Sequence, residues 1–312
     1  MLSSITVLSG GTGSAKFIRG LSRLVPDHSI TVIANVGDNF WFHDLLVCPD
    51  IDTITYMFAG ILDERRGWGI RRDSFHCLTM LRKLGYPSWF NVGDTDLAVH
   101  VARTELIRKQ NPLSKITTRI AKVLGVKARI LPATDSNLQT FVLTKSTTMH
   151  LQEFWVQRNG RPAVVGINYT NAELAEPAPG VIEAIEDADA VMVSPANPVT
   201  SIGPILAVNK ITRALEKNRK KVIGVSPIIG REPVSGPAGK FLKALGHEVS
   251  SLSVAKLYRN VIGSFVIHHT DAEFLQRISE LGVRCFAMDI IMKDARTEKT
   301  LAQKVLQAAT PQ

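Results

Sequence analysis

The segment "LSGGTGSAKFIRGL", residues 8–21, decides the fold class of this chain. An apolar run ends in a glycine-rich loop, and the loop leads directly into a helix-forming segment. A strand that turns into a helix through glycines is typical of α/β proteins, in which the helix N-terminus offers free N–H groups to a phosphate. We therefore expect a phosphate-binding loop here.

The loop matches neither of the two common phosphate-binding motifs. Gly11 and Gly13 fit the dinucleotide motif G-x-G-x-x-G, but Lys16 stands where the third glycine belongs. The P-loop motif G-x-x-x-x-G-K-[ST] is not satisfied in this stretch. The loop thus predicts a phosphate-bearing ligand without specifying which one.

Strands and helices alternate at both ends of the chain. Residues 4–37 read as a strand, a helix from Ser14 to about Leu24, and a second strand. The alternation returns with predicted strands at 187–195, 220–227, 260–269 and 283–289, and predicted helices at 203–217, 237–245, 272–281 and the C-terminus. Nearly continuous apolar strands indicate a parallel sheet covered by helices on both faces. We predict an α/β fold with a Rossmann-like, doubly wound, mainly parallel sheet.

The middle of the chain has a different character, and we interpret residues 53–180 as an insertion within a single α/β domain of residues 1–312. Residues 53–125 read as mostly helical, and residues 128–168 as β-rich. The short β-type runs are "ARILPA" (128–133), "LQTFVLTK" (138–145), "MHLQEFWVQ" (149–157) and "PAVVGINY" (162–169). Because both flanks belong to one sheet, we expect the insertion not to fold separately.

The composition indicates a soluble globular protein. The 312 residues are 45% hydrophobic and 21% charged, which suffices for a sizeable core. No apolar run approaches the roughly 18 residues of a membrane helix, and the N-terminus lacks a signal-peptide pattern. Three widely spaced cysteines do not make a disulfide framework. We expect a cytoplasmic protein without a membrane partner.

The formal charge of +9 raises the question of a nucleic-acid partner. The basic residues are spread out, and the densest run, "EKNRKKV" at 216–222, falls at the end of a predicted helix. Lys and Arg interact favourably with the helix dipole there. We therefore expect no nucleic-acid partner, whereas an anionic small molecule would benefit from the same positive field.

Four polar loops follow predicted strands, where ligands bind in open α/β sheets. They are "SGGTGS" (9–14), "NVGDNFWFHDLLVCPDIDT" (35–53), "SPANPVTSIGPIL" (194–206) and "SPIIGREPVSGPAGKFL" (226–242). Their predicted nucleotide- or phosphate-binding residues are Gly10, Gly11, Thr12, Gly13, Asn197, Ser201, Ser226 and Gly236. Such loops can also merely cap helices, but four at one sheet edge exceed what capping requires. We predict a phosphorylated ligand.

The second of these loops carries four aspartates, Asp38, Asp44, Asp50 and Asp52, close to aromatic residues. Carboxylates beside a phosphate loop are the oxygen ligands that Mg²⁺ takes, usually one or two of them. The alternative for each aspartate is a turn or a helix cap. In "WFNVGDTDLAVHVART" (89–104), Asp94 and Asp96 precede a predicted helix, and capping and a ligand role stay equally open.

Together these segments resemble the 2-phospho-L-lactate transferase family of coenzyme F-420 biosynthesis. The resemblance runs over essentially the whole chain, and "CPDIDT" (48–53) with "RGWGI" (66–70) is its most specific part. It implies transfer of a phospho-lactyl or phosphoenolpyruvyl group to the ribityl hydroxyl of the deazaflavin Fo, with release of GMP. The implied donor is lactyl-2-diphospho-5′-guanosine or its enolpyruvyl analogue. Mg²⁺ as cofactor and a homodimer are also implied.

Matched motif by motif, the resemblance implies that Asp38 and Asp52 are catalytic carboxylates that bind the metal. It implies that Asp52 and Asn91 contact Fo. Many relatives carry Lys or Arg in place of Asn91, and their common "GDRD" reads "GDTD" here. We expect the insertion to form part of the Fo pocket, with Trp68 and Phe90 near the carboxyl edge of the sheet.

Two other functions are compatible with a glycine loop on this fold. A regulatory protein that binds a nucleotide sugar would share the loop and the sheet, but such proteins lack the "CPDIDT…RGWGI" segment. A nicotinamide dehydrogenase is disfavoured by Lys16 at the third-glycine position. It is also disfavoured because Asp38 comes several residues too late to end the second strand.

Overall fold

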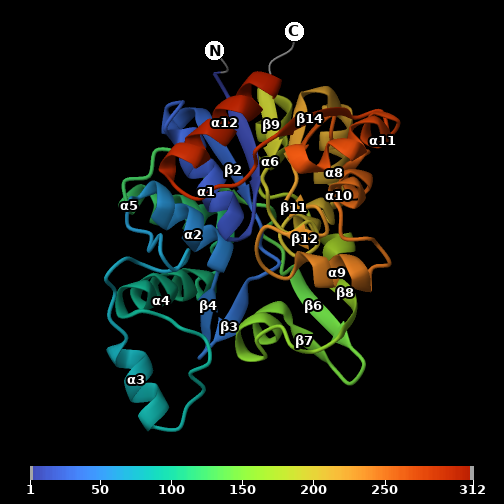
Figure 1. The fold of residues 1–312 in the computed structure, drawn as a ribbon. Helices are drawn as coiled ribbons and strands as arrows, with labels where there is room; N and C mark the ends of the chain where they lie inside the picture. The colour runs from blue at the N-terminus through green and yellow to red at the C-terminus, as the bar shows by residue number, and fades with distance from the viewer. Residues whose placement is uncertain (1–2, 310–312) are drawn as a thin grey trace.

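A seven-stranded parallel sheet forms the centre of the computed structural model, which describes residues 3–309 (Figure 1). The strand order is β14-β13-β10-β9-β1-β2-β5. The strands are β1 (Ile5–Ser9), β2 (Ile30–Ala34), β5 (Arg129–Pro132), β9 (Ala190–Val193), β10 (Val222–Val225), β13 (Ser264–His268) and β14 (Arg284–Met288). Chain order runs outward in both directions from the β1–β9 pair, so the strand order reverses there. The predicted doubly wound α/β fold is confirmed.

The sheet is apolar on both faces because helices cover both. In β1, Val7 belongs to one hydrophobic cluster and its neighbour Leu8 to the other, as expected when successive side chains point to opposite faces. The first cluster contains residues of α1 (Gly11–Ser22), α2 (Pro49–Phe58) and α12 (Ala295–Ala309). The second contains residues of α6 (Val181–Glu186), α8 (Asn209–Lys217), α9 (Ala238–Ala244) and α10 (Ser251–Tyr258).

The remaining elements are shorter or lie outside the central sheet. They are η1 (Asp27–Ser29), β3 (Phe40–Phe42), β4 (Leu45–Val47), α3 (His76–Lys83), α4 (Asp94–Arg108), α5 (Leu113–Val123), β6 (Gln139–Thr144), β7 (Thr148–His150), η2 (Glu153–Gln157), β8 (Val164–Thr170), η3 (Ala172–Leu174), α7 (Gly203–Leu206), η4 (Arg219–Lys221), β11 (Ile228–Ile229), β12 (Glu232–Pro233), η5 (His269–Phe274) and α11 (Leu275–Ser279). No helix within residues 3–309 is both long enough and apolar enough to cross a membrane.

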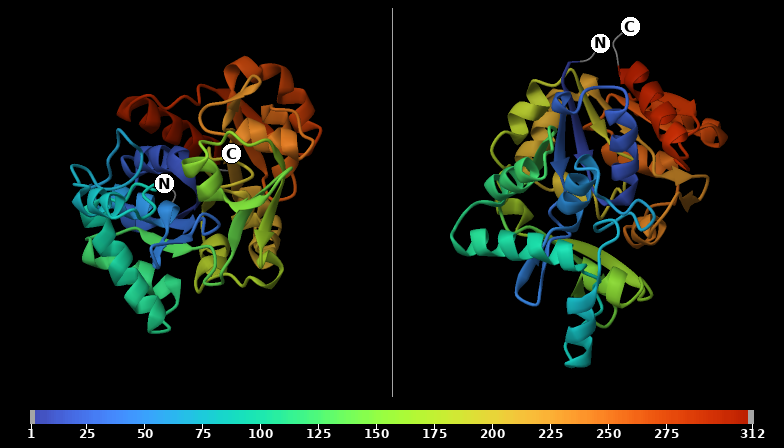
Figure 2. Two further views of the ribbon diagram at one scale, coloured as in Figure 1. Left: turned by 90° about the horizontal axis from the view of Figure 1, so that it is seen from below. Right: turned by 90° about the vertical axis from the view of Figure 1, so that its left-hand side faces the viewer.

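The helices α3 and α4 and the antiparallel sheet β7-β6-β8 lie at the end of the molecule opposite the two termini (Figures 1 and 2). Because β1 begins near the N-terminus, this is the end at which the carboxyl ends of the parallel strands lie. The inserted elements therefore stand beside the edge where ligands bind in folds of this type.

Two runs of the middle segment differ from their predicted structure. "ARILPA" supplies β5 of the central sheet, paired in parallel with β2, because Ile130 and Leu131 are buried there instead of in the β-rich part. "MHLQEFWVQ" is a strand only up to His150 and continues as the helical turn η2. The spacing of the buried side chains Leu151 and Phe154 is helical, and the Phe154 ring packs against Phe241 of α9.

Helices also differ in detail from their predicted bounds. The first begins at Gly11 rather than Ser14, and the predicted helix 203–217 is split into α7 and α8. The split occurs because Val208 is extended, with φ −77° and ψ 101°. Helix α10 was not predicted; the Ser250 side chain caps it by accepting a hydrogen bond from the Ser253 N–H.

Gly20 allows α1 and α12 to pack closely. A Cβ atom at this position would collide with the backbone carbonyl of Glu298 in α12. The same interface is closed by Arg19 and Arg23, whose guanidinium groups both bind the buried Glu298 carboxylate. The glycine therefore serves helix packing, not ligand binding.

We expect Gly20→Ala to lower the free energy of unfolding by about 1–3 kcal/mol, the usual cost of overpacking a core. Alanine favours a helix over glycine by about 1 kcal/mol, so a loss would come from the collision alone. Ser22→Ala on the same helix is the control, since its hydroxyl only bonds to a carbonyl within α1. Urea unfolding of both variants measures the difference; equal stability would contradict the packing role.

Candidate active site

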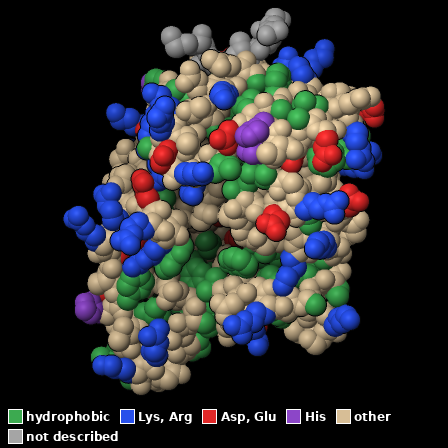
Figure 3. Space-filling view, in the orientation of Figure 1, with side chains coloured by type: hydrophobic (Ala, Val, Ile, Leu, Met, Phe, Trp, Pro, Cys, Tyr) green, Lys and Arg blue, Asp and Glu red, His purple; other side chains and the backbone are tan. Residues whose placement is uncertain are grey.

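A cavity of about 1120 Å³ opens at the carboxyl edge of the sheet, beside the β1–β9 switch point. Its walls come from the loops after β1, β2, β9, β10 and β14 and from the inserted segments. Figure 3 shows one face of the molecule, in the orientation of Figure 1, with a hollow near its middle and hydrophobic side chains around the hollow. On the same face the Lys and Arg side chains are scattered and do not form one patch.

The cavity brings together residues that are far apart in the sequence. All eight predicted nucleotide- or phosphate-binding residues line it, as do Asp38, Asp52 and Asn91. Trp68 and Phe90 line it too, so the inserted segment reaches the carboxyl edge as expected. Which of these residues contact a ligand stays a prediction.

Glycine is required in the first loop for two different structural reasons. Gly11 has φ +70°, which favours glycine, whereas Gly10 and Gly13 allow the loop after β9 to approach. A Cβ at Gly10 would lie 2.7 Å from the Ser201 Cβ, and one at Gly13 would collide with the Pro195 carbonyl. The glycines at positions 10 and 13 thus reflect close contact between the loop after β1 and the loop after β9.

Asp50 and Asp38 form a pair of carboxylates beside this loop. Asn35, at the end of β2, donates from one amide nitrogen to Asp38 Oδ1 and Asp50 Oδ2, at 2.8 Å each. The Gly11 N–H donates to Asp50 Oδ1 at 2.6 Å, and the Gln152 side chain donates to Asp38 Oδ2 at 3.2 Å. The two acids therefore share one amide donor, and no cation of the described chain is paired with them.

The surroundings of Asp38 and Asp50 disfavour the state in which both carboxyl groups are ionised. Burial, and then the charge of Asp50, raise the pKa of Asp38 well above its ordinary value, against the hydrogen bonds from Asn35 and Gln152. Burial also raises the pKa of Asp50, against the hydrogen bonds from Gly11 and Asn35. A bound cation would relieve both effects, because it stabilises the charged form of each carboxyl group.

Asp52 belongs to a second cluster, on the other side of α2. Residues 50 and 52 are two positions apart in a helix, which turns their side chains about 200° from each other. Arg103 of α4, only 1% exposed, donates from both Nη atoms to the two oxygens of Asp52. Its Nη1 also donates to the Leu46 carbonyl at 3.2 Å and lies 3.1 Å from His100 Nδ1.

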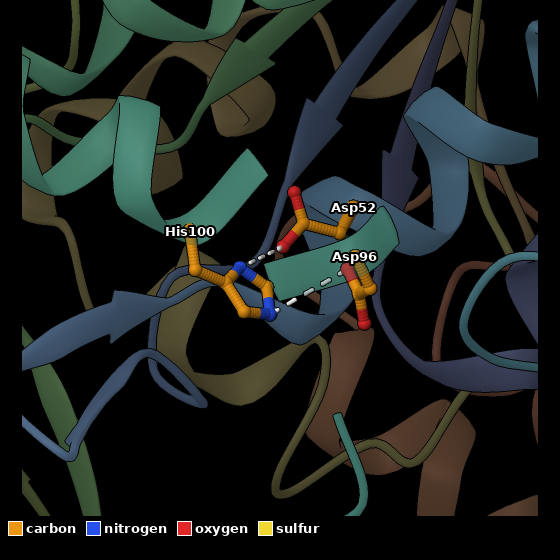
Figure 4. A group of neighbouring side chains, drawn as sticks. All are labelled: Asp52, Asp96 and His100. Atoms are coloured by element: carbon orange, nitrogen blue, oxygen red, sulfur yellow. Dashed lines mark ion pairs between the residues drawn. The ribbon is translucent and has the colours of Figure 1, made fainter. Parts of the chain in front are cut away.

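His100 lies between Asp52 and Asp96 (Figure 4). Its Nδ1 is 3.7 Å from Asp52 Oδ2, and its Nε2 is 3.5 Å from Asp96 Oδ1, both beyond good hydrogen-bond length. The Tyr56 hydroxyl donates to Asp96 Oδ1 at 2.6 Å. Ligand atoms of Asp52, Asp96 and His100 lie within 4.8 Å of one another, a spacing that can hold a metal ion. The Arg103 guanidinium, which contacts two of the three, opposes a cation there.

Burial dominates the protonation of this second cluster. It lowers the pKa of His100 to about 4, despite the opposing charge of Asp52, so the imidazole is neutral at pH 7. Burial and then the charge of Asp52 raise the pKa of Asp96 to about 7, against the Tyr56 hydrogen bond. Burial and the neighbouring Asp52 also raise the pKa of Tyr56, so its hydroxyl remains a donor.

The open question about Asp94 and Asp96 is answered by a reciprocal capping arrangement. Asp73 caps α4, since its carboxylate accepts from the Thr95 and Asp96 N–H groups. Asp94 caps the other helix, α3, by accepting from the N–H groups of His76 and Cys77. Asp96 is thereby free of a capping role and lines the cavity.

An aromatic cluster made of Phe40, Phe42, Trp89 and Phe90 reaches the cavity through Phe90, which lines it. The Phe40 and Phe90 rings meet edge-to-face at 4.8 Å, and Phe42 meets Trp89 at 5.3 Å. The β3–β4 hairpin carries two of them, and its turn places His43 and Asp44 at positive φ. Asp44 is thus a turn residue outside the cavity lining.

Sequence reasoning missed Asn35, His100 and Arg103. A signal existed, because Asp96, His100 and Arg103 are spaced i, i+4 and i+7 and so share one face of α4. Their partner Asp52 comes from another helix, which the spacing within α4 does not reveal.

The raised pKa of Asp96 predicts a pH-dependent stability. An acid whose pKa rises from 3.8 unfolded to about 7 folded stabilises the protein below pH 3.8, and that contribution is lost as the pH rises through 7. Between those values the loss approaches about 1.4 kcal/mol per pH unit. We expect Asp96→Asn to flatten the pH dependence of the unfolding free energy between pH 5 and pH 7, measured by urea unfolding. Parallel curves for the two proteins would refute this.

The fold and the site define an α/β protein with a glycine-loop cavity at the switch point of its sheet. The model of the family described as 2-phospho-L-lactate transferase CofD matches residues 5–308, and the chain belongs to this family.

Relatives of nearly equal length support the assignment. The chain is 38% identical to the 2-phospho-L-lactate transferase of Methanosarcina barkeri over 300 residues, covering 96% of each chain. It is 36% identical to the protein of that name from Methanocaldococcus jannaschii over 311 residues, covering 98% of each. The phosphoenolpyruvate transferase of Streptomyces avermitilis is 38% identical over 311 residues, again with 98% of each covered. These names support transferase as the class of enzyme.

A solved structure has the same fold. The crystal structure of a UPF0052 family protein from Bacillus halodurans matches with a TM-score of 0.64 and covers 98% of this chain and 99% of that chain. The sequence identity is 14%, so this likeness concerns the fold alone.

Proposed function

We propose that this protein transfers a phospho-lactyl or phosphoenolpyruvyl group from a guanylated diphospho donor to the ribityl hydroxyl of Fo, releasing GMP. The observation that carries the proposal is the joining of three features in one cavity. These are the glycine loop, the Asp38–Asp50 pair and the aromatic side chains of Tyr56, Trp68, Phe90 and Trp155. A nucleotide diphosphate, a divalent cation and a flat ring system would each find a matching surface there.

The donor would occupy the loops after β1, β9 and β10. Their lining residues include Gly11, Thr12, Asn197 and Ser201, which offer backbone and side-chain hydrogen-bonding groups to phosphates. Lys16, Arg66 and Lys293 also line the cavity and supply positive charge. Such donors stabilise the charge that develops on phosphoryl oxygens during transfer.

A Mg²⁺ ion would be held by Asp38, with Asp50 as the second carboxylate. The two carboxylates fit the ion, because they accept from one shared amide nitrogen and pair with no cationic side chain among residues 3–309. The family resemblance implied Asp52 as the second metal ligand, but its two oxygens accept from Arg103. When bound, Mg²⁺ would neutralise developing charge on the diphosphate.

The acceptor would lie against the aromatic side of the cavity. Trp68 and Phe90 line it there, and Asp52 and Asn91 are the proposed contacts of Fo. Asn91 is exposed and uncharged. It would therefore hold the acceptor through hydrogen bonds and not through an ion pair.

The test is a mixture of the protein, Fo, Mg²⁺ and either guanylated donor, followed for GMP release and for the mass of the deazaflavin product. We expect GMP and a phospho-acid ester of Fo in equal amounts, with a preference for one of the two donors. No GMP release, together with tight binding of a nucleotide sugar, would instead identify a regulatory protein. Light scattering of the same sample tests the proposed homodimer.

A further inference from the structure

We propose that His100 and Asp96 bind the reacting hydroxyl of the acceptor, with His100 Nε2–H donating to its oxygen and Asp96 accepting its hydrogen. The inference rests on the proposed function and adds two substrate-binding residues to it. Both residues line the cavity, and both are on α4. Arg103 and Tyr56 are the positioning residues that hold the pair.

Arg103 determines which ring nitrogen of His100 carries the hydrogen. A guanidinium group can only donate, so His100 Nδ1, 3.1 Å from Arg103 Nη1, has to be the acceptor. In a neutral imidazole the other nitrogen, Nε2, is then the N–H donor. Because Arg103 is fully buried and bound to both Asp52 oxygens, this arrangement is fixed before a ligand arrives.

The His100 Nε2–H donor has no acceptor. Among residues 3–309, the atom is buried and makes no hydrogen bond. Its nearest acidic oxygen, Asp96 Oδ1, is 3.5 Å away and is already the acceptor of the Tyr56 hydroxyl at 2.6 Å. A buried donor without a partner costs roughly 1–3 kcal/mol, and a hydrogen bond to a bound ligand would remove that cost.

The pair selects a hydroxyl group by its chemistry. A hydroxyl oxygen accepts from His100 Nε2–H while its hydrogen turns to the Asp96 carboxylate, so one group satisfies both residues. A carbonyl or phosphate oxygen could accept from His100 but has no hydrogen to donate to Asp96. The gap of 3.5 Å between His100 Nε2 and Asp96 Oδ1, too long for a direct bond, suits such a bridging group.

The location also suits the reacting hydroxyl. The pair faces Asp52 on α2, and Asp50, two residues earlier on the same helix, binds the Gly11 N–H of the glycine loop. Two helical residues span only about 3 Å along the axis. The hydroxyl site at His100 and Asp96 and the proposed phosphate site therefore open into the same cavity.

The experiment compares two substitutions of His100, each of which places a polar group where only one of the two imidazole nitrogens lies. The amide nitrogen of His100→Gln reaches the place of Nε2 and keeps the donor, whereas His100→Asn reaches only the place of Nδ1. Equilibrium binding of Fo and of its analogue without the terminal hydroxyl is measured for both variants and the parent protein. The donor is left out, so that binding is read without turnover.

We expect the parent protein to bind Fo about tenfold more tightly than the deoxy analogue, the usual effect of a buried hydrogen-bond pair. His100→Gln is expected to retain most of this ratio, and His100→Asn to bring it close to one while binding of the deoxy analogue stays unchanged. A tenfold ratio preserved in His100→Asn would overturn the inference. Failure of the parent protein to bind Fo at all would instead overturn the proposed function.

A second measurement remains decisive if His100→Asn does not fold. Long-range ¹H–¹⁵N spectra of the parent protein report which nitrogen of His100 is protonated. We expect the Nε2–H form in the free protein, with the Nε2 proton signal shifting when Fo binds and not when the deoxy analogue binds. An Nδ1–H form, or equal shifts with both ligands, would refute the proposal.

Discussion

Replacing Arg103 by Met is expected to lower the free energy of unfolding by about 3–5 kcal/mol, the largest stability effect we predict. The substitution leaves Asp52 buried without its counter-charge, because both of its oxygens accept from Arg103. It also removes the donor to the Leu46 carbonyl and so loosens the β4–α4 contact. Urea unfolding at pH 7 measures the loss.

Two comparisons show whether the unpaired charge is responsible. Arg108→Met, on the exposed end of the same helix, is expected to change stability by no more than about 0.5 kcal/mol. The double variant Arg103→Met, Asp52→Asn removes both charges and is expected to recover part of the loss. If the double variant is less stable than Arg103→Met alone, burial of an unpaired Asp52 is not the cause.

Replacing Asp50 by Asn is expected to reduce kcat about 100-fold or more, the largest effect on activity that we predict. The amide oxygen of Asn can still accept from the Gly11 N–H, which binds Asp50 Oδ1 at 2.6 Å, so the loop keeps its anchor. What disappears is one of the two charges proposed to hold Mg²⁺. GMP release as a function of Mg²⁺ concentration is the measurement, and the apparent Mg²⁺ affinity should fall with kcat.

Asp44→Asn is the matched control for Asp50→Asn. Asp44 lies in the same loop region but is exposed, occupies the hairpin turn at φ 57° and is absent from the cavity lining. Asn tolerates this backbone conformation, so we expect unchanged kcat and unchanged Mg²⁺ dependence. Near-normal turnover by Asp50→Asn with unaltered Mg²⁺ affinity would contradict the metal-binding role. Asp50 would then only hold the glycine loop in place.

The sheet was predictable because its strands are buried on both faces and leave a local apolar pattern in the sequence. Each of β1, β9, β10 and β13 is buried along its entire length. The edge strand β5 was misassigned, because four residues between a helical and a β-rich stretch carry no sign of which sheet they join. The helical turn η2 was missed because "EFWVQ" has the composition of a strand, and only its packing against α9 makes it helical.

The candidate site was predictable as a collection of loops but not as a set of contacts. Polar loops after parallel strands meet at one edge for topological reasons, so residues such as Gly11, Asn197 and Ser226 line one cavity. Which aspartate faces which partner depends on the rotation of α2. That rotation turns Asp50 toward the glycine loop and Asp52 toward Arg103.

The sequence by itself thus determined the doubly wound sheet, the glycine-rich loop between β1 and α1, and the family, since each is encoded in short contiguous patterns. Only the tertiary structure decided that Asp38 is joined to Asp50 through Asn35, and that Asp52 belongs with Arg103, His100 and Asp96. The physical reason is that charge pairing and hydrogen bonding act over a few ångströms in space. Asp52 and Arg103 are 51 positions apart in the sequence, and the residues between them carry no local signal of that contact.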